Sequence, residues 1–277
     1  MYAKLTTIHS VADSEKSPVV FVHGFPDSPR MFAAYFSETE RQQPWLQGRS
    51  IYTYAFPNRH DNPNFPPLSQ LTRGVLAREF DQTMDEIARQ SPTGKLIFIS
   101  HDWGATHTWR WARSRKNPPI EKMVALSVGS SFRYDIYEHG LNAFTWLYGL
   151  MFVSPWYLPF MRRIVPPLIV KFAGYRSETA SELWKDAYHY WDRPSLFLTI
   201  LPQALFMLFY TPEYLNFPFP VLYMRTKLDK IASTAAFERH IQSRPDSKLI
   251  IYENYNHWFP EQHSDVVLPE VRKFIGE

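Results

Sequence analysis

The feature that most constrains the fold of this chain is a regular alternation of short strand patterns with helical patterns. Before residue 129, runs of apolar and β-branched residues predict four strands, at Val19–Val22, Ile51–Ala55, 95–100 and 123–128. Helical spacing of apolar side chains predicts helices at 69–90 and 105–115. Strands that alternate with helices form a mainly parallel sheet flanked by helices, so we expect the α/β class.

The alternation is interrupted between residues 129 and 217. This segment has helical patterns, prolines and aromatic residues but no convincing strand. Strand and helix patterns then return, at 221–224, 232–244, Lys248–Tyr252 and 266–275. A chain of 277 residues accommodates one domain with such an insertion. We therefore predict an α/β core made of residues 1–128 and 218–277, and an inserted helical cap at 129–217.

Composition disfavours several classes of function. The net charge is only +3 at pH 7 and no Lys/Arg run is present, so we expect no nucleic-acid partner. The absence of cysteine rules out disulfides and thiol catalysis. No Gly-rich phosphate loop and no His–carboxylate cluster with ligand spacing occurs, so we expect neither a metal nor another cofactor. The first residues lack a secretory signal pattern, and we expect a cytoplasmic protein.

The predicted cap is rich in apolar and aromatic residues. Its two most apolar stretches, 141–174 and 196–210, are interrupted by prolines, so neither pattern is that of a membrane-spanning helix. This composition favours a cap that buries an apolar substrate pocket. The alternative is a surface that makes peripheral contact with a membrane.

The segment Ser100-His101-Asp102-Trp103-Gly104 lies where a predicted buried strand meets a helix. Small residues two positions before and after Asp102 suit a sharp turn that holds the central side chain above the strand ends. The helix N-terminus favours an anion there. An ionised carboxylate suits attack on the carbon of an epoxide or alkyl halide rather than on an amide. The alternative is that Asp102 only caps the helix, as aspartates in this position usually do.

The chain carries three motifs at separate places, HGFPDSP at 23–29, SHDWGA at 100–105 and NHWFPE at 256–261. Together they resemble the epoxide hydrolase and haloalkane dehalogenase branch of the α/β-hydrolase fold. Their order and spacing span nearly the whole chain. The HDWGA string is the most specific, since serine hydrolases of this fold carry Ser where this string has Asp102. The resemblance implies the α/β-hydrolase fold, and soluble epoxide hydrolases are the most similar group.

The resemblance also implies catalytic roles. Asp102 matches the nucleophile, and His257 matches the general base that activates water. Asp229 matches the acid that orients the imidazole, with Glu253 as the reserve candidate. Relatives usually have Gly where Thr226 stands, which weakens the match around this acid. The order nucleophile, acid, histidine is the one expected for this fold.

The HGFP motif would complete the site on the other side of the nucleophile. The backbone N–H groups of Phe25 and Trp103 would form an oxyanion hole. Pro26 would fix the turn that carries the first of these groups. We expect His23 and Pro26 beside the substrate, with a structural hydrogen bond as the favoured role of the His23 ring.

The cap decides between the two activities of this branch. Epoxide hydrolases protonate the leaving oxygen with two cap tyrosines. Tyr148 lies where the first is expected, but the sequence has Ile-Leu-Pro where the second should be. The displaced candidates for the second are Tyr188, Tyr190 and Tyr210.

Haloalkane dehalogenases instead hold the halide with N–H donors. Here Trp103 would supply one donor, and either Trp146 or Trp156 would supply the second.

We therefore expect a cofactor-independent hydrolase that opens a lipophilic epoxide to a vicinal diol. The intermediate would be an ester on Asp102, hydrolysed by water that His257 activates. Its partners would be a small lipophilic substrate and water. Two alternatives stay open: a haloalkane dehalogenase with the same triad, and a degenerate hydrolase that serves as a binding protein.

Overall fold

The computed structural model describes residues 3–24, 27–56, 73–130, 214–229 and 234–276, and also Leu158, Phe160, Met161 and Ile164. The predicted cap at 129–217 therefore lies mostly outside the described residues. Within the described part, no helix is long and apolar enough to cross a membrane.

The described residues form a seven-stranded sheet in the order β1-β3-β2-β4-β5-β6-β7. The strands are β1 (Lys4–His9), β2 (Val19–Val22), β3 (Ile51–Ala55), β4 (Leu96–His101), β5 (Ile120–Leu126), β6 (Val221–Thr226) and β7 (Lys248–Tyr252). All neighbouring pairs are parallel except β1 with β3, which is antiparallel. The predicted α/β class with a mainly parallel sheet is thus confirmed.

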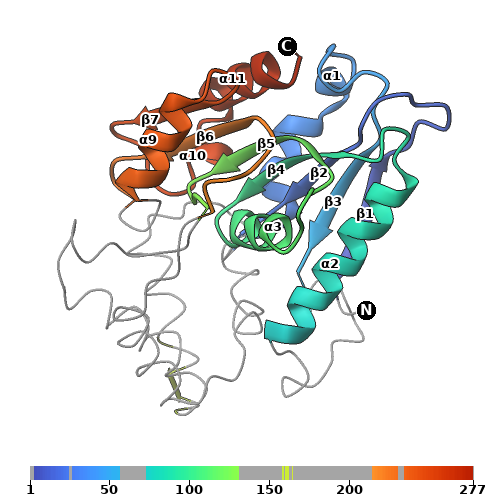
Figure 1. The fold of residues 1–277 in the computed structure, drawn as a ribbon. Helices are drawn as coiled ribbons and strands as arrows, with labels where there is room; N and C mark the ends of the chain where they lie inside the picture. Colours follow the sequence, from blue (N-terminus) through green and yellow to red (C-terminus); the bar gives the residue numbers. More distant parts are fainter. Residues whose placement is uncertain are drawn as a thin grey trace.

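Helices cover both faces of this sheet (Figure 1). One face packs against α2 (Arg73–Gln90), α3 (Trp103–Arg113) and α9 (Ala235–Ser243). The other face packs against the 3₁₀ helix η1 (Pro29–Phe36) and α11 (Ser264–Gly276). Two short helices, α1 (Glu38–Arg41) and α10 (Phe259–Gln262), complete the described elements.

The alternation of side chains along each strand explains the two cores. In β2, Val20 and Val22 belong to the core under α2, α3 and α9, whereas Val19 and Phe21 belong to the core under η1 and α11. A strand buried on both faces reads as a continuous apolar run, which is why the sequence predicts β2 and β3 with their observed bounds.

The sequence does not predict strand β1. It is the antiparallel edge strand, and its residues are exposed or only partly buried. It therefore carries no apolar run, and backbone pairing with β3 defines it instead.

The topology brings four segments to one edge of the sheet. Because β4, β5, β6 and β7 are parallel neighbours, their carboxyl ends lie side by side. Asp102 follows β4 and Asp229 follows β6, while His257 follows β7. Ligand sites of open α/β sheets lie beyond these carboxyl ends. The chain leaves this edge after β5 and returns at β6, which is the predicted point of insertion.

Candidate active site

Asp102 occupies a strained turn between β4 and α3. Its backbone has φ 49° and ψ −117°, a conformation that L-residues rarely adopt. Its N–H donates to the carbonyl of Leu126 at 3.1 Å, which ties the turn to the end of β5. Its side chain makes no capping hydrogen bond to α3, and the residue is 6% exposed. Asp102 therefore occupies the N-cap position of α3 without capping this helix through its side chain.

Small residues are required around this turn. A Cβ on Gly104 would lie 2.2 Å from the carbonyl oxygen of Val22 and 2.5 Å from that of His23. A Cβ on Gly24 would lie 2.5 Å from the Cβ of Asp102. Real Cβ atoms do not come this close to other heavy atoms, so the two glycines allow β2 and the turn to pack together.

His257 lies between two carboxylates. Its Nδ1 donates a hydrogen bond to Oδ2 of Asp229, and its Nε2 lies 3.6 Å from Oδ1 of Asp102. The side chains of both aspartates are less than a tenth exposed, whereas that of His257 is 21% exposed. The structure thus brings together the three residues that the sequence predicts as nucleophile, base and acid.

The charges around His257 set its protonation state. Burial lowers the pKa of its imidazole, but the carboxylates of Asp229, Asp102 and Asp27 outweigh burial and raise the pKa from 6.5 to about 9. The ring is therefore an imidazolium at neutral pH in the resting protein. Removal of one of these negative charges would lower the pKa of the ring and favour its neutral form.

The turn that carries Asp229 is held by a residue that departs from the family pattern. The N–H of Asp229 donates to the hydroxyl of Thr226 at 3.1 Å and to the carbonyl of Thr226 at 3.3 Å. Thr226 is fully buried. The reserve acid, Glu253, instead forms an exposed ion pair with Lys227, at 2.6 Å.

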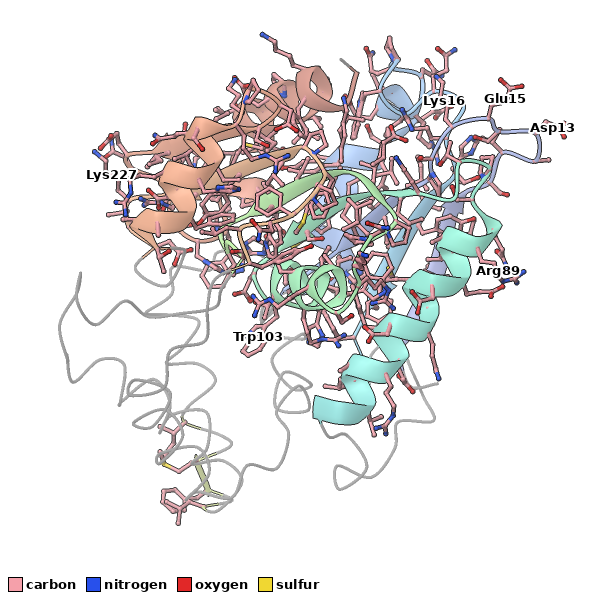
Figure 2. All side chains as sticks on the ribbon, in the orientation of Figure 1. Asp13, Glu15, Lys16, Arg89, Trp103 and Lys227 are labelled. Atoms are coloured by element: carbon pink, nitrogen blue, oxygen red, sulfur yellow. The ribbon has the colours of Figure 1, made fainter. Side chains whose placement is uncertain are left out.

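Other predicted residues lie beside the triad or outside the described residues. His23 is fully buried; its Nδ1 donates to the carbonyl of Gly24 at 2.8 Å, and its Nε2 accepts the N–H of Phe56 at 3.3 Å. These two bonds fit the structural role favoured for its ring. Trp103 begins α3 and extends from the edge of the core in Figure 2. The remaining predicted residues lie outside the described residues: Phe25, Pro26, Trp146, Tyr148, Trp156, Tyr188, Tyr190 and Tyr210.

Sequence reasoning gives no role to two buried polar residues at the site. Asp27 is 4% exposed and contributes to the raised pKa of His257. His101 is fully buried and donates from Nε2 to the backbone carbonyl of His257, at 3.0 Å. Both lie inside the motifs that carry the family resemblance, but only the fold shows that they approach His257.

Comparison with solved structures shows the same fold. A mutant of an epoxide hydrolase from Bacillus megaterium superposes with a TM-score of 0.64 at 14% identity, covering 99% of this chain and 97% of that chain. The esterase EaEST from Exiguobacterium antarcticum gives a TM-score of 0.64 at 13% identity, covering 99% and 96%. An esterase from Thermogutta terrifontis gives 0.60 at 14% identity, covering 99% and 92%. At these identities the likeness concerns the fold.

The match to a sequence family covers most of the chain. Residues 19–270 match the alpha/beta hydrolase family, which includes the turn at Asp102, the acid and the histidine. No curated protein sequence matches the chain. The family match, the parallel sheet and the residues gathered at its carboxyl edge agree: this chain belongs to the alpha/beta hydrolase family.

Proposed function

We propose that this protein hydrolyses an epoxide through an ester formed on Asp102. The observation that carries the proposal is an aspartate, not a serine, at the sharp turn after β4, within 3.6 Å of Nε2 of His257. A serine in that place needs a base to take its proton, whereas a carboxylate is already the nucleophile. The histidine is then available for the second step.

The first step is a displacement at carbon. An oxygen of Asp102 attacks one epoxide carbon, the carbon–oxygen bond of the ring breaks, and the ring oxygen takes a proton. Tyr148 is our candidate for the donor of this proton. The product is a hydroxyalkyl ester of Asp102, and its formation removes the negative charge of that carboxylate.

The loss of this charge prepares the second step. The carboxylate of Asp102 is one of the groups that raise the pKa of His257. When Asp102 becomes a neutral ester, the pKa of His257 falls, and the ring can give its proton to the phenolate that the first step leaves on the donor. The neutral ring then accepts a proton from water as the oxygen of that water attacks the ester carbonyl. The carbon–oxygen bond to the alkoxide breaks, and the proton of the new carboxyl group passes to the alkoxide, so the diol leaves and the carboxylate reforms. Asp229 orients the ring and stabilises its positive charge through the hydrogen bond from Nδ1.

The assembled triad argues against a degenerate hydrolase. A protein that only binds ligands has no need to hold an aspartate in a strained turn, which costs about 1–3 kcal/mol. A dehalogenase would share all three residues, and Trp103 would suit the leaving halide. Substrate tests separate it from an epoxide hydrolase.

The test is intact-mass spectrometry of His257→Gln after exposure to lipophilic epoxides and alkyl halides. We expect an adduct with the mass of the whole epoxide, mapped by peptide analysis to Asp102. An adduct equal to the alkyl group after loss of halide would identify a dehalogenase instead. His257→Gln combined with Asp102→Asn is the control and should give no adduct. Absence of any adduct from both classes in His257→Gln, or full turnover in Asp102→Ala, would refute the mechanism.

A further inference from the structure

The backbone carbonyl of His257 is bound from two neighbouring strand ends. His101, the last residue of β4, donates to it from Nε2 at 3.0 Å. Ser127, which follows β5, donates to it from Oγ at 3.3 Å. Both donors are fully buried. The imidazole of His257 is held on its other side by Asp229, which follows β6. Three consecutive strands therefore hold the loop that carries the base.

Ser127 has a backbone conformation that would suit glycine. Its φ is 69°, in the left-handed region that a residue with a Cβ adopts at a cost. Its backbone is fixed in this conformation because its N–H donates to the carbonyl of Met224 at 2.8 Å and its carbonyl accepts the hydroxyl of Tyr223 at 3.1 Å. The hydrogen bond from the Ser127 hydroxyl to the carbonyl of His257 explains why a residue with a side chain, and not glycine, occupies this position.

His101 is suited to donate without adding charge. Burial lowers its pKa well below 6.5, and the nearby charge of His257 lowers it further. A neutral ring that donates from Nε2 has an unprotonated Nδ1, and Nδ1 of His101 has no hydrogen-bond partner among the residues that the structure describes. Its ring also contacts that of His257, with centroids 4.7 Å apart.

We propose that Ser127 and His101 are positioning residues that fix the backbone of His257, so that its Nε2 faces Asp102 while its Nδ1 stays on Asp229. The inference rests on the proposed function, since it assigns their purpose to the hydrolysis step. Without the two bonds, the loop after β7 is free to shift, and the ring moves out of line with the ester and the attacking water.

The experiment compares Ser127→Ala and Ser127→Gly with Ser130→Ala. Ser130 is a matched control, because it is a buried serine nearby whose hydroxyl has no hydrogen-bond partner among the described residues. The first readout needs no substrate: the pKa of His257, measured by NMR of ring-labelled histidine. The groups that face this ring are Asp27, Asp102, Asp229 and His101, and none of them is changed by these variants.

Both Ser127 variants should lower the pKa of His257 by roughly half a unit, because a looser ring lies farther from its carboxylates. The second readout is the rate of ester hydrolysis, which should fall roughly fivefold while the rate of ester formation is unchanged. Ser127→Gly relieves the positive φ and should therefore have a higher melting temperature than Ser127→Ala. If Ser127 had only a structural role, the defect at His257 would be smaller in the more stable Ser127→Gly variant. The positioning role predicts the same defect at His257 in both variants.

The outcomes separate the two proposals. If the pKa of His257 falls in the Ser127 variants but no substrate alkylates Asp102, the positioning role stands and the proposed function fails. If an ester forms on Asp102 while both variants keep the wild-type pKa and the wild-type hydrolysis rate, the positioning role is overturned. His101 is tested in the same way: His101→Gln keeps an N–H donor and should retain more hydrolysis than His101→Phe.

Discussion

The raised pKa of His257 makes a quantitative prediction about stability. The pKa of the His257 imidazole is taken as its ordinary value of 6.5 in the unfolded chain, and it is about 9 in the folded protein. A shift of this size corresponds to about 3 kcal/mol of stability, since one pKa unit is about 1.4 kcal/mol. The side chain is only 21% exposed, so solvent screens its interactions little. The perturbation is His257→Gln, which removes the charge at every pH.

Because the pKa of His257 is raised in the folded protein, its stabilisation is present at low pH and is lost as the pH rises. Below about pH 6 the ring is protonated in both the folded and the unfolded chain, and the full stabilisation is present. Between pH 6.5 and about 9 the unfolded chain loses the proton while the folded protein keeps it, so the stabilisation declines. Above about pH 9 the ring is neutral in both states and contributes nothing. The free energy of unfolding of wild type minus that of His257→Gln should therefore be about 3 kcal/mol larger at pH 6 than at pH 10.

The assay is urea unfolding at pH values between 6 and 10, followed by tryptophan fluorescence. Trp109 and Trp111 are buried, at 1% and 0% exposure, and should report unfolding of the core. Variant His9→Gln, at an exposed histidine of β1, controls for the loss of any histidine. A difference between wild type and His257→Gln that stays constant across this pH range would refute the electrostatic account of the site.

Three further perturbations test other features. Gly104→Ala would place a Cβ 2.2 Å from a carbonyl oxygen of β2, so it should prevent folding or lower the free energy of unfolding in urea by more than about 3 kcal/mol. The control Gly94→Ala has open space and only a φ of +67°, so it should cost about 1 kcal/mol. Equal costs would contradict the packing argument. Arg272→Met removes the cation paired with Glu40 of α1, whose side chain is 5% exposed, and should lower the free energy of unfolding by about 3 kcal/mol. Lys248→Met breaks an exposed ion pair and should lower it by less than about 1 kcal/mol. Phe160, in the predicted cap, is 61% exposed. On the alternative that this cap contacts membranes, Phe160→Asp should weaken flotation with anionic phospholipid vesicles, and wild type that does not float would exclude that alternative.

Much of the core is predictable because burial leaves a pattern in the sequence. Strands enclosed between two layers of helices are apolar throughout, and the sharp turn at Asp102 requires small neighbours, so both leave local signals. The exposed edge strand β1 leaves no such signal, because its pairing with β3 depends on backbone hydrogen bonds.

The contacts around the base cannot be predicted in the same way. Asp229 and Glu253 are both acidic residues that follow strands; the family resemblance favours Asp229, and the bond to His257 is seen only in the fold. Ser127 and His257 are separated by 130 positions, and nothing near Ser127 in the sequence marks its positive φ. These are properties of strand register and of the turns beyond it, which single-residue preferences do not encode.

The order of the elements along the chain has a consequence for assembly during synthesis. The turn at Asp102 is completed by β2, β4 and β5, all of which precede residue 129, and its bond to Leu126 joins two of these early strands. The acid and the base arrive only with the segments around β6 and β7. The three residues of the site can therefore come together only after residues 221–257 have been synthesised and have joined the sheet.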